Sequence, residues 1–149
     1  MPNYKKVIFI CKENLTQSPM AEWLFKSIVM DVEKVIISRG LVVLYPEPVN
    51  PKVVELLTRH GVPCEESTSQ PFDSGEIDKE TLIITMNSIE KIKIAEDLSL
   101  SENIYTINEY IEQEGELLDP YGKEEEDYEK CYMELKDYLY LMRKKLGWQ

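Results

Sequence analysis

The sequence has few cysteines and almost no histidine. Its three cysteines, Cys11, Cys64 and Cys131, are odd in number and far apart, and His60 is the single histidine. This pattern is typical of free thiols in a reducing compartment and argues against a disulfide framework. Because no Cys-x-x-Cys pair or Cys/His cluster is present, we predict no metal site, and nothing in the sequence indicates a cofactor.

Long apolar runs and a surplus of positive charge are missing as well. The apolar run from Val7 to Ile10 is too short for a signal-peptide core. No segment approaches the roughly 20 apolar residues that span a bilayer, so we expect a cytoplasmic protein without a membrane partner. Seventeen basic residues stand against 28 acidic ones, for a net charge of −11. Because nucleic acid needs a basic surface, this balance argues against nucleic acid as a partner.

What the sequence does contain is ordinary globular composition with alternating patterns. Its 149 residues are 43% hydrophobic and 30% charged, which fits a single domain spanning 1–149 with its own core. Unbroken apolar runs predict strands at 6–10, 35–38, 82–86 and 104–107. Helical spacing predicts helices at 19–31, 51–60, 88–98 and 124–146, the first one capped by Ser18 with Pro19 in its first position. This alternation predicts an α/β fold of three layers, α/β/α, around a four-stranded parallel sheet.

The segment between the first strand and the first helix is the candidate for chemistry. Ligands of open α/β sheets bind at the carboxyl ends of the strands, and Cys11 stands where the first strand ends. The loop from Cys11 to Ser18 can turn several backbone N–H groups toward one point, where the helix dipole adds partial positive charge. Such a setting binds an anion and stabilises a cysteine thiolate. Position alone leaves a second interpretation equally open, in which Cys11 is a small buried core residue.

A wider pattern favours the first interpretation. Cys11, Asn14 and the run Ser18-Pro19-x-Ala21-Glu22 resemble the signature Cys-x-Gly-Asn-x-Cys-Arg-Ser-Pro-x-Ala-Glu of the low-molecular-weight protein tyrosine phosphatases. The likeness continues in the same order at Ser38-x-Gly40, at Asn50 to Leu57 with His60-Gly61-Val62, and at Asp119-Pro120-Tyr121-Gly122 followed by Tyr128-Glu129. Several motifs in one order are more specific than a single motif, so most of the chain resembles this family.

The resemblance assigns roles to individual residues. Cys11 would attack phosphorus and form a cysteinyl phosphate, and Asp119 would protonate the leaving group and then activate water. Asn14 would adopt the left-handed turn that shapes the loop, Ser18 would hydrogen-bond the Cys11 thiolate, and Tyr121 would form an aromatic wall for the substrate. The phosphate group would contact the loop residues Lys12, Glu13, Asn14, Leu15, Thr16 and Ser18. Without the other motifs, Asp119 would be interpreted as the first residue of a surface turn.

Three loop positions depart from the family signature. Gln17 stands where the signature has arginine, whose planar, charged fork binds phosphate through paired hydrogen bonds. Comparable arginines contribute about 10³ to 10⁵ in the rate of phosphoryl transfer. Glu13 replaces a glycine and brings a carboxylate to the anion site, where Lys12 offsets part of that charge. Thr16 replaces the second cysteine, so the disulfide that this cysteine can form with the nucleophile is absent.

Arg39 is a possible source of replacement charge. It follows the second strand, which the predicted topology sets beside the first, so its side chain can approach the loop. One hypothesis is therefore that Arg39 partly replaces the missing guanidinium and contacts the substrate. The more ordinary alternative is an exposed arginine that pairs with surface carboxylates.

Two functions from different classes follow from these residues. The first is a phosphomonoesterase of this family with activity lowered by Gln17, acting as a monomer or weak dimer on a phosphorylated protein or a small phosphate monoester. The second is a catalytically dead pseudophosphatase that binds phosphate or phosphoproteins as a regulatory module. Arsenate reduction on the same fold is excluded, because it needs two further cysteines close together in sequence and Cys64 and Cys131 stand alone.

Overall fold

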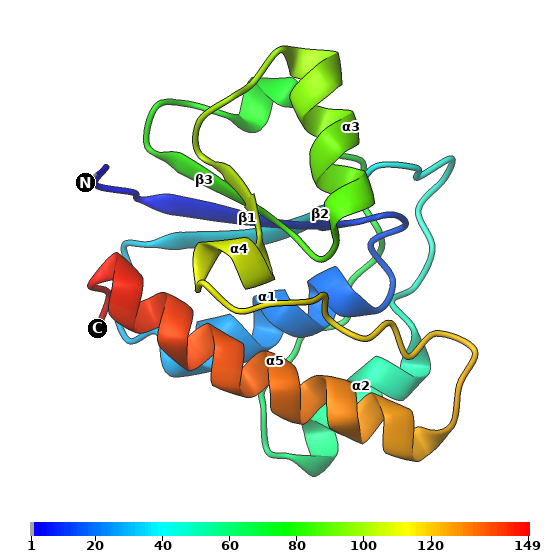
Figure 1. Cartoon of the computed structure of the whole chain (residues 1–149). Coiled ribbons are helices and arrows are strands. Elements are labelled where there is room, and N and C mark those ends of the chain that lie inside the picture. The colour runs from blue at the N-terminus through cyan, green and yellow to red at the C-terminus, as the bar shows by residue number, and fades with distance from the viewer. Residues whose placement is uncertain (1) are drawn as a thin grey trace.

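A parallel sheet forms the centre of the protein (Figure 1). The computed structural model describes residues 2–149, and its strands are β1 (Lys6–Cys11), β2 (Val35–Gly40), β3 (Thr81–Thr85) and β4 (Ile104–Thr106). Their order in the sheet is β2-β1-β3-β4, and every pairing is parallel. From β1 the chain passes to β2 on one side of β1 and later to β3 on its other side, so the direction of strand order reverses at β1. Ligands of such sheets bind outside the carboxyl ends of the strands at this reversal.

Helices cover both faces of the sheet, which confirms the predicted three-layer α/β/α fold. In Figure 1, α3 (Ser88–Leu98) lies above the sheet, and α1 (Gln17–Ile28), α2 (Pro51–Arg59), α4 (Ile107–Tyr110) and α5 (Glu125–Leu146) lie below it. A short 3₁₀ helix, η1 (Ser74–Glu76), precedes β3. Within residues 2–149, no helix combines the length and the apolarity that crossing a membrane requires.

Each face of the sheet has its own apolar core, and β1 contributes to both. Phe9 belongs to the larger core, where its ring meets that of Phe25 of α1 edge to face at a centroid distance of 5.6 Å. Ile8 and Ile10 belong to the smaller core under α3. Because successive side chains of a strand point to opposite faces, the apolar run of β1 reports a strand that is covered on both sides.

The structure corrects several predicted boundaries. The first helix, predicted to reach residue 31, ends at Ile28, and the second strand, predicted at 35–38, extends to Gly40. The strand expected at 104–107 ends at Thr106, because Thr106 opens α4 in a capping box with Glu109. The first helix begins at Gln17 and not at Pro19, with Thr16 in the cap position. The predicted capping role of Ser18 is therefore wrong: Ser18 lies inside the first turn, where its hydroxyl group has other partners.

Candidate active site

The loop between β1 and α1 folds around the sulfur atom of Cys11. The backbone N–H groups of Glu13, Asn14 and Ser18 act as hydrogen-bond donors that lower the pKa of the Cys11 thiol. Asn14 makes the turn possible by adopting a left-handed conformation with a φ of 59°, which asparagine tolerates better than most residues. The loop thus presents several donors to one point, as the stabilisation of an oxyanion requires.

Side-chain hydrogen bonds hold this loop in shape. The Asn14 amide nitrogen donates to the hydroxyl oxygens of Ser18 and Ser38, at 2.9 Å each. Asn14 Oδ1 accepts from the backbone N–H of Gln70 at 2.9 Å. Since a backbone N–H can only donate, this bond fixes which end of the amide faces the hydroxyls. Ser18 Oγ lies 2.9 Å from Cys11 Sγ, and its own hydrogen is available to the sulfur because Asn14 already donates to Ser18.

The end of β2 packs directly against the loop. The backbone N–H of Leu41 donates to the carbonyl oxygen of Cys11 at 3.2 Å. A Cβ atom on Gly40 would lie 2.8 Å from the Glu13 carbonyl carbon and 2.9 Å from the Asn14 nitrogen. Glycine at position 40 therefore allows the close approach of the two backbones.

A cavity opens at the Cys11 sulfur, on the side of the sheet where the strands end. It is lined by Cys11, Lys12, Glu13, Leu15, Thr16, Gln17, Glu90, Asp119 and Tyr121. The structure thus brings Cys11 to one place with Asp119 and Tyr121, which lie more than 100 residues later in the sequence. Asp119 and Tyr121 are exposed, and Asp119 Oδ1 accepts from the backbone N–H of Tyr121 at 3.0 Å. The Asp119 carboxylate is therefore held against its own loop.

Opposing effects act on the ionisation of Cys11. Burial raises the pKa of the Cys11 thiol above its ordinary value, whereas hydrogen bonds from the Ser18 hydroxyl and from the loop amides lower this pKa. Burial is the larger effect. A nearby cation would favour the thiolate, but Gln17 carries no charge. The sulfur is therefore less ionised than it would be beside the arginine of the family signature.

Gln17 is bonded to the loop that carries Asp119. Its side chain is buried, with 4% of the residue exposed, and Nε2 donates to the Leu118 carbonyl oxygen at 3.1 Å. One hydrogen of the amide that replaces the guanidinium is thus already used within the protein.

The other loop residues divide between solvent and the start of α2. Lys12 and Glu13 are exposed at the cavity. Thr16 is buried, and its hydroxyl oxygen accepts from Asn50 Nδ2 at 3.3 Å. The Leu15 carbonyl oxygen accepts from the backbone N–H of Asn50 at 3.0 Å. These bonds anchor the loop to α2.

The structure does not bring Arg39 to the cavity. Its guanidinium pairs with the Glu76 carboxylate at nitrogen–oxygen distances of 2.8 to 3.1 Å. The reason lies in the register of the sheet: Arg39 is paired with Ile10, whose side chain lies in the core under α3. Arg39 therefore faces away from the side on which α1 and its loop lie. The hypothesis that Arg39 supplies the missing charge has no geometric support, and its pairing with a carboxylate matches the ordinary alternative.

Glu90 is a cavity residue that the sequence analysis missed. It lies in the first turn of α3, is 5% exposed, and accepts from Asn87 Nδ2 at 3.0 Å. Burial raises the pKa of its carboxyl group, and the negative charges of Glu116 and Asp119 raise it further, while Lys12 lowers it. The available signal was positional: Glu90 lies just after β3, at the reversal of the strand order.

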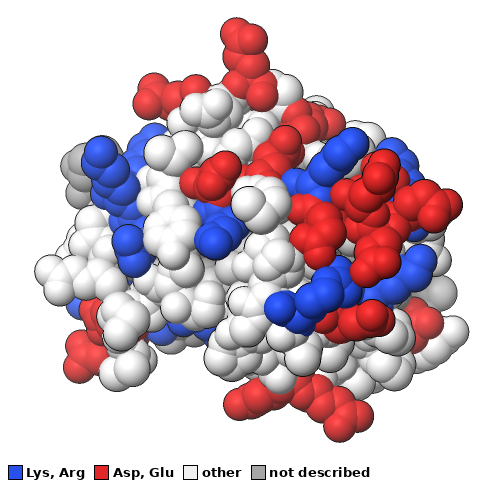
Figure 2. All heavy atoms as spheres, turned by 90° about the horizontal axis from the view of Figure 1, so that it is seen from below, with Lys and Arg blue, Asp and Glu red and all other residues white. Residues whose placement is uncertain are grey.

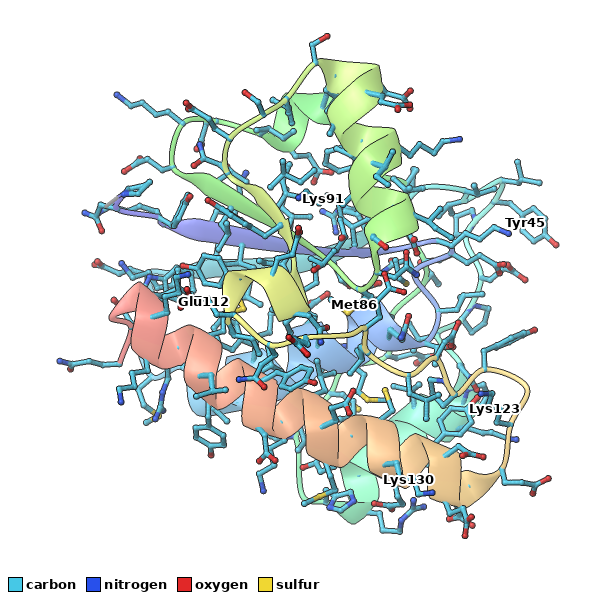
Figure 3. All side chains as sticks on the ribbon, viewed as in Figure 1. Tyr45, Met86, Lys91, Glu112, Lys123 and Lys130 are labelled. Carbon is cyan, nitrogen blue, oxygen red and sulfur yellow. The ribbon has the colours of Figure 1, made fainter. Side chains whose placement is uncertain are left out.

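The charges around the cavity are mixed. Figure 2 shows carboxylates together with Lys and Arg side chains on the right, toward the end of the molecule where α5 begins. Figure 3 shows Tyr45 projecting outward from the loop after β2 and Lys123 on the loop before α5, and neither of them lines the cavity. Within residues 2–149, no cluster of His, Cys, Asp and Glu side chains is arranged to hold a metal ion.

Comparisons with known proteins point to one family. The family model of low molecular weight phosphotyrosine protein phosphatase matches residues 6–148. The low molecular weight protein-tyrosine-phosphatase PtpB of Staphylococcus aureus is 32% identical over 130 residues, covering 87% of this chain and 91% of that protein. A YwlE mutant from Bacillus subtilis is 29% identical with a TM-score of 0.84, covering 95% of this chain and 98% of that chain. A YwlE arginine phosphatase with a cysteine-to-serine mutation and a phosphorylated active-site serine is 28% identical with a TM-score of 0.83, covering 95% of both chains.

Proposed function

The chain belongs to the low molecular weight phosphotyrosine protein phosphatase family, and from this premise we propose that it hydrolyses phosphate monoesters in two steps through Cys11. One observation carries the proposal. The backbone amides of Glu13, Asn14 and Ser18 converge on the Cys11 sulfur, in a cavity that Asp119 also lines. This arrangement supplies a nucleophile, donors for the phosphate oxygens and a carboxyl group for proton transfer.

In the first step, the Cys11 thiolate attacks the phosphorus atom. An S–P bond forms while the P–O bond to the leaving group breaks. Asp119 gives its proton to the departing oxygen, so that a neutral alcohol or phenol leaves. The loop amides bind the non-bridging oxygens, over which the charge of the transition state is spread.

In the second step, a water molecule attacks the phosphorus atom of the cysteinyl phosphate. The Asp119 carboxylate takes a proton from this water, the S–P bond breaks, and inorganic phosphate leaves. The Ser18 hydroxyl, 2.9 Å from the sulfur, stabilises the thiolate that departs. Tyr121, exposed beside Asp119, would flank an aromatic leaving group.

Gln17 lowers the rate of this reaction in our proposal. Arginines that bind the transferred phosphoryl group contribute about 10³ to 10⁵ in rate, and a neutral amide cannot replace their charge or their paired hydrogen bonds. The bond from Gln17 to Leu118 also takes one of the two amide hydrogens. We therefore expect slow turnover compared with family members that carry the arginine.

A pseudophosphatase is the second candidate, and the weakened ionisation of Cys11 favours it. Burial raises the pKa of the Cys11 thiol, which leaves less of the nucleophilic thiolate. In this case the loop would bind a phosphate group without hydrolysing it.

The substrate class within this proposal is a phosphorylated protein or a small phosphate monoester. Two kinds of phosphorylated residue are candidates, because PtpB is named a tyrosine phosphatase and YwlE an arginine phosphatase. Tyr121 fits an aromatic leaving group, whereas the carboxylates of Glu90 and Asp119 fit a cationic one. Peptides with phosphotyrosine or phosphoarginine, assayed side by side for released phosphate, distinguish the two.

The test of the proposed function is hydrolysis of p-nitrophenyl phosphate at high enzyme concentration. We expect slow turnover that Cys11→Ser abolishes and that Cys64→Ser, the matched change at a half-buried cysteine, leaves intact. Activity that survives Cys11→Ser contradicts the mechanism. A wild-type protein that binds phosphate by calorimetry and shows no turnover identifies the pseudophosphatase.

A further inference from the structure

Gln17 does more than occupy the place of the family's arginine. We propose that Gln17 is a positioning residue that holds the Asp119 loop over the cavity through its hydrogen bond to Leu118. The inference rests on the proposed role of Asp119 as general acid. It gives Gln17 a function that differs from binding phosphate.

The Asp119 loop has few other directional contacts. Within residues 2–149, the bond from Gln17 is the single hydrogen bond that joins residues 117–123 to the rest of the protein. Their other two bonds are internal: the Lys123 N–H donates to the Pro120 carbonyl at 2.9 Å, and the Tyr121 N–H donates to Asp119. Leu117 and Pro120 are buried, but apolar contact is non-directional. Just before this stretch, Glu116 accepts from the backbone N–H of Ser88 at 2.7 Å, which ties the start of the loop to α3. The Gln17 bond fixes where the part that carries Asp119 lies relative to the cavity.

The Asp119 carboxylate moves with its loop. Its Oδ1 accepts from the backbone of Tyr121 at 3.0 Å, so the position of the loop sets the position of the acid. Leu118, the acceptor of the Gln17 bond, is the residue directly before Asp119. A displacement at Leu118 is thus passed on to the proton donor.

Gln17 is well placed to join the two halves of the site. It is the first residue of α1, the helix whose start shapes the loop around Cys11. Because Gln17 is 4% exposed, movement of the Asp119 loop would leave a buried amide donor without a partner, which is unfavourable. The buried amide thus favours the loop position in which Asp119 lines the cavity with Cys11.

The kinetic test compares two esters that differ in their need for an acid. Phenyl phosphate has a poor leaving group that must be protonated, whereas dinitrophenyl phosphate has a good one that need not be. Gln17→Met keeps the length of the side chain and removes its donor. Because both esters form the same cysteinyl phosphate, kcat/KM reports the first step, in which the leaving group departs. We expect kcat/KM for phenyl phosphate to fall about 3- to 10-fold relative to kcat/KM for the dinitrophenyl ester, the effect of one hydrogen bond.

Two further variants make this test specific. Gln113→Met is the same change at an exposed glutamine just before the Asp119 loop and should leave the ratio of the two kcat/KM values unchanged. In an Asp119→Asn background, Gln17→Met should cause no further change in that ratio, because the acid is already missing. An equal loss of kcat/KM on both esters overturns the inference.

A second measurement does not depend on turnover. Backbone amide hydrogen exchange in residues 117–123 should be faster in Gln17→Met than in wild-type protein or in Gln113→Met. If the wild-type protein hydrolyses neither ester, the proposed function is wrong, and the exchange rates still decide whether Gln17 holds the loop. Unchanged exchange in Gln17→Met overturns the positioning role.

Discussion

Removing the Ser18 hydroxyl group should raise the pKa of the Cys11 thiol. Ser18 Oγ lies 2.9 Å from Cys11 Sγ, and Asn14 donates to the same oxygen, so the Ser18 hydrogen is directed at sulfur. A hydrogen bond to the charged form favours that form. Ser18→Ala removes this donor, and ionisation of Cys11 therefore requires a higher pH.

The size of the shift follows from one lost bond. A hydrogen bond to a charged group contributes about 1.5–3 kcal/mol, and one pKa unit corresponds to about 1.4 kcal/mol. The pKa of Cys11 should therefore rise by about one to two units. The backbone amides of Glu13 and Asn14 still lower the pKa of Cys11 in this variant. The shift is therefore limited to the contribution of the Ser18 hydroxyl group. At a fixed pH below the pKa, the thiolate fraction falls about 10- to 100-fold.

The assay is the rate of alkylation by iodoacetamide as a function of pH, followed by mass spectrometry of the peptide that contains Cys11. Ser27→Ala is the matched control, because Ser27 lies on the same helix and its hydroxyl donates to the Leu24 carbonyl at 2.6 Å. The control should keep the wild-type midpoint. A midpoint that is equal in Ser18→Ala and wild-type protein would refute the assigned direction of the bond.

Three further changes test the rest of the site. Gln17→Arg combined with Glu13→Gly should raise kcat/KM on aryl phosphates by about 10³ or more, since the arginine contributes about 10³ to 10⁵. A double variant that stays at the wild-type rate shows that the cause of slow turnover lies outside these two positions. Glu90→Gln should tighten the binding of inorganic phosphate in calorimetry by removing a negative charge from the cavity, whereas Glu96→Gln, an exposed position on the same helix, should not. This gain should shrink as the pH falls through the raised pKa of Glu90, because the wild-type carboxyl then becomes neutral. Gly40→Ala should lower the free energy of unfolding by about 1–3 kcal/mol, the usual range for overpacking, because its Cβ would lie 2.8 Å from the loop backbone; an unchanged thermal midpoint would contradict the close approach.

The sheet could be predicted because its signals are local. The run from Val7 to Ile10 is apolar without a break, and in the structure it is buried on both faces. Alternation of strands and helices then restricts the topology to a few parallel arrangements. The boundary at Thr106 was also visible as a Thr-x-x-Glu capping box, but the apolar Ile107 extended the strand pattern past it.

The contacts within the site depend on register and on distant segments, and a single sequence does not report these. Whether the Arg39 side chain faces α1 or α3 depends on its pairing with Ile10. A change of this pairing by one residue would turn the side chain to the other face of the sheet. Gln17 and Leu118 are 101 residues apart in sequence. They are in contact because the fold places the loop before α5 beside the start of α1. Glu90 carries no motif of its own, and its position in the cavity follows from the fold.

The claim that Cys11 is a nucleophile is tested most directly by trapping its phosphate. Dinitrophenyl phosphate needs little help from an acid, and Asp119→Asn removes the base of the second step, so a cysteinyl phosphate should accumulate in this variant. After rapid quenching, we predict one phosphate on the peptide that contains Cys11 and none when Cys11→Ala is added. Ester hydrolysis without phosphate on this peptide, or phosphate on another residue, would contradict the mechanism.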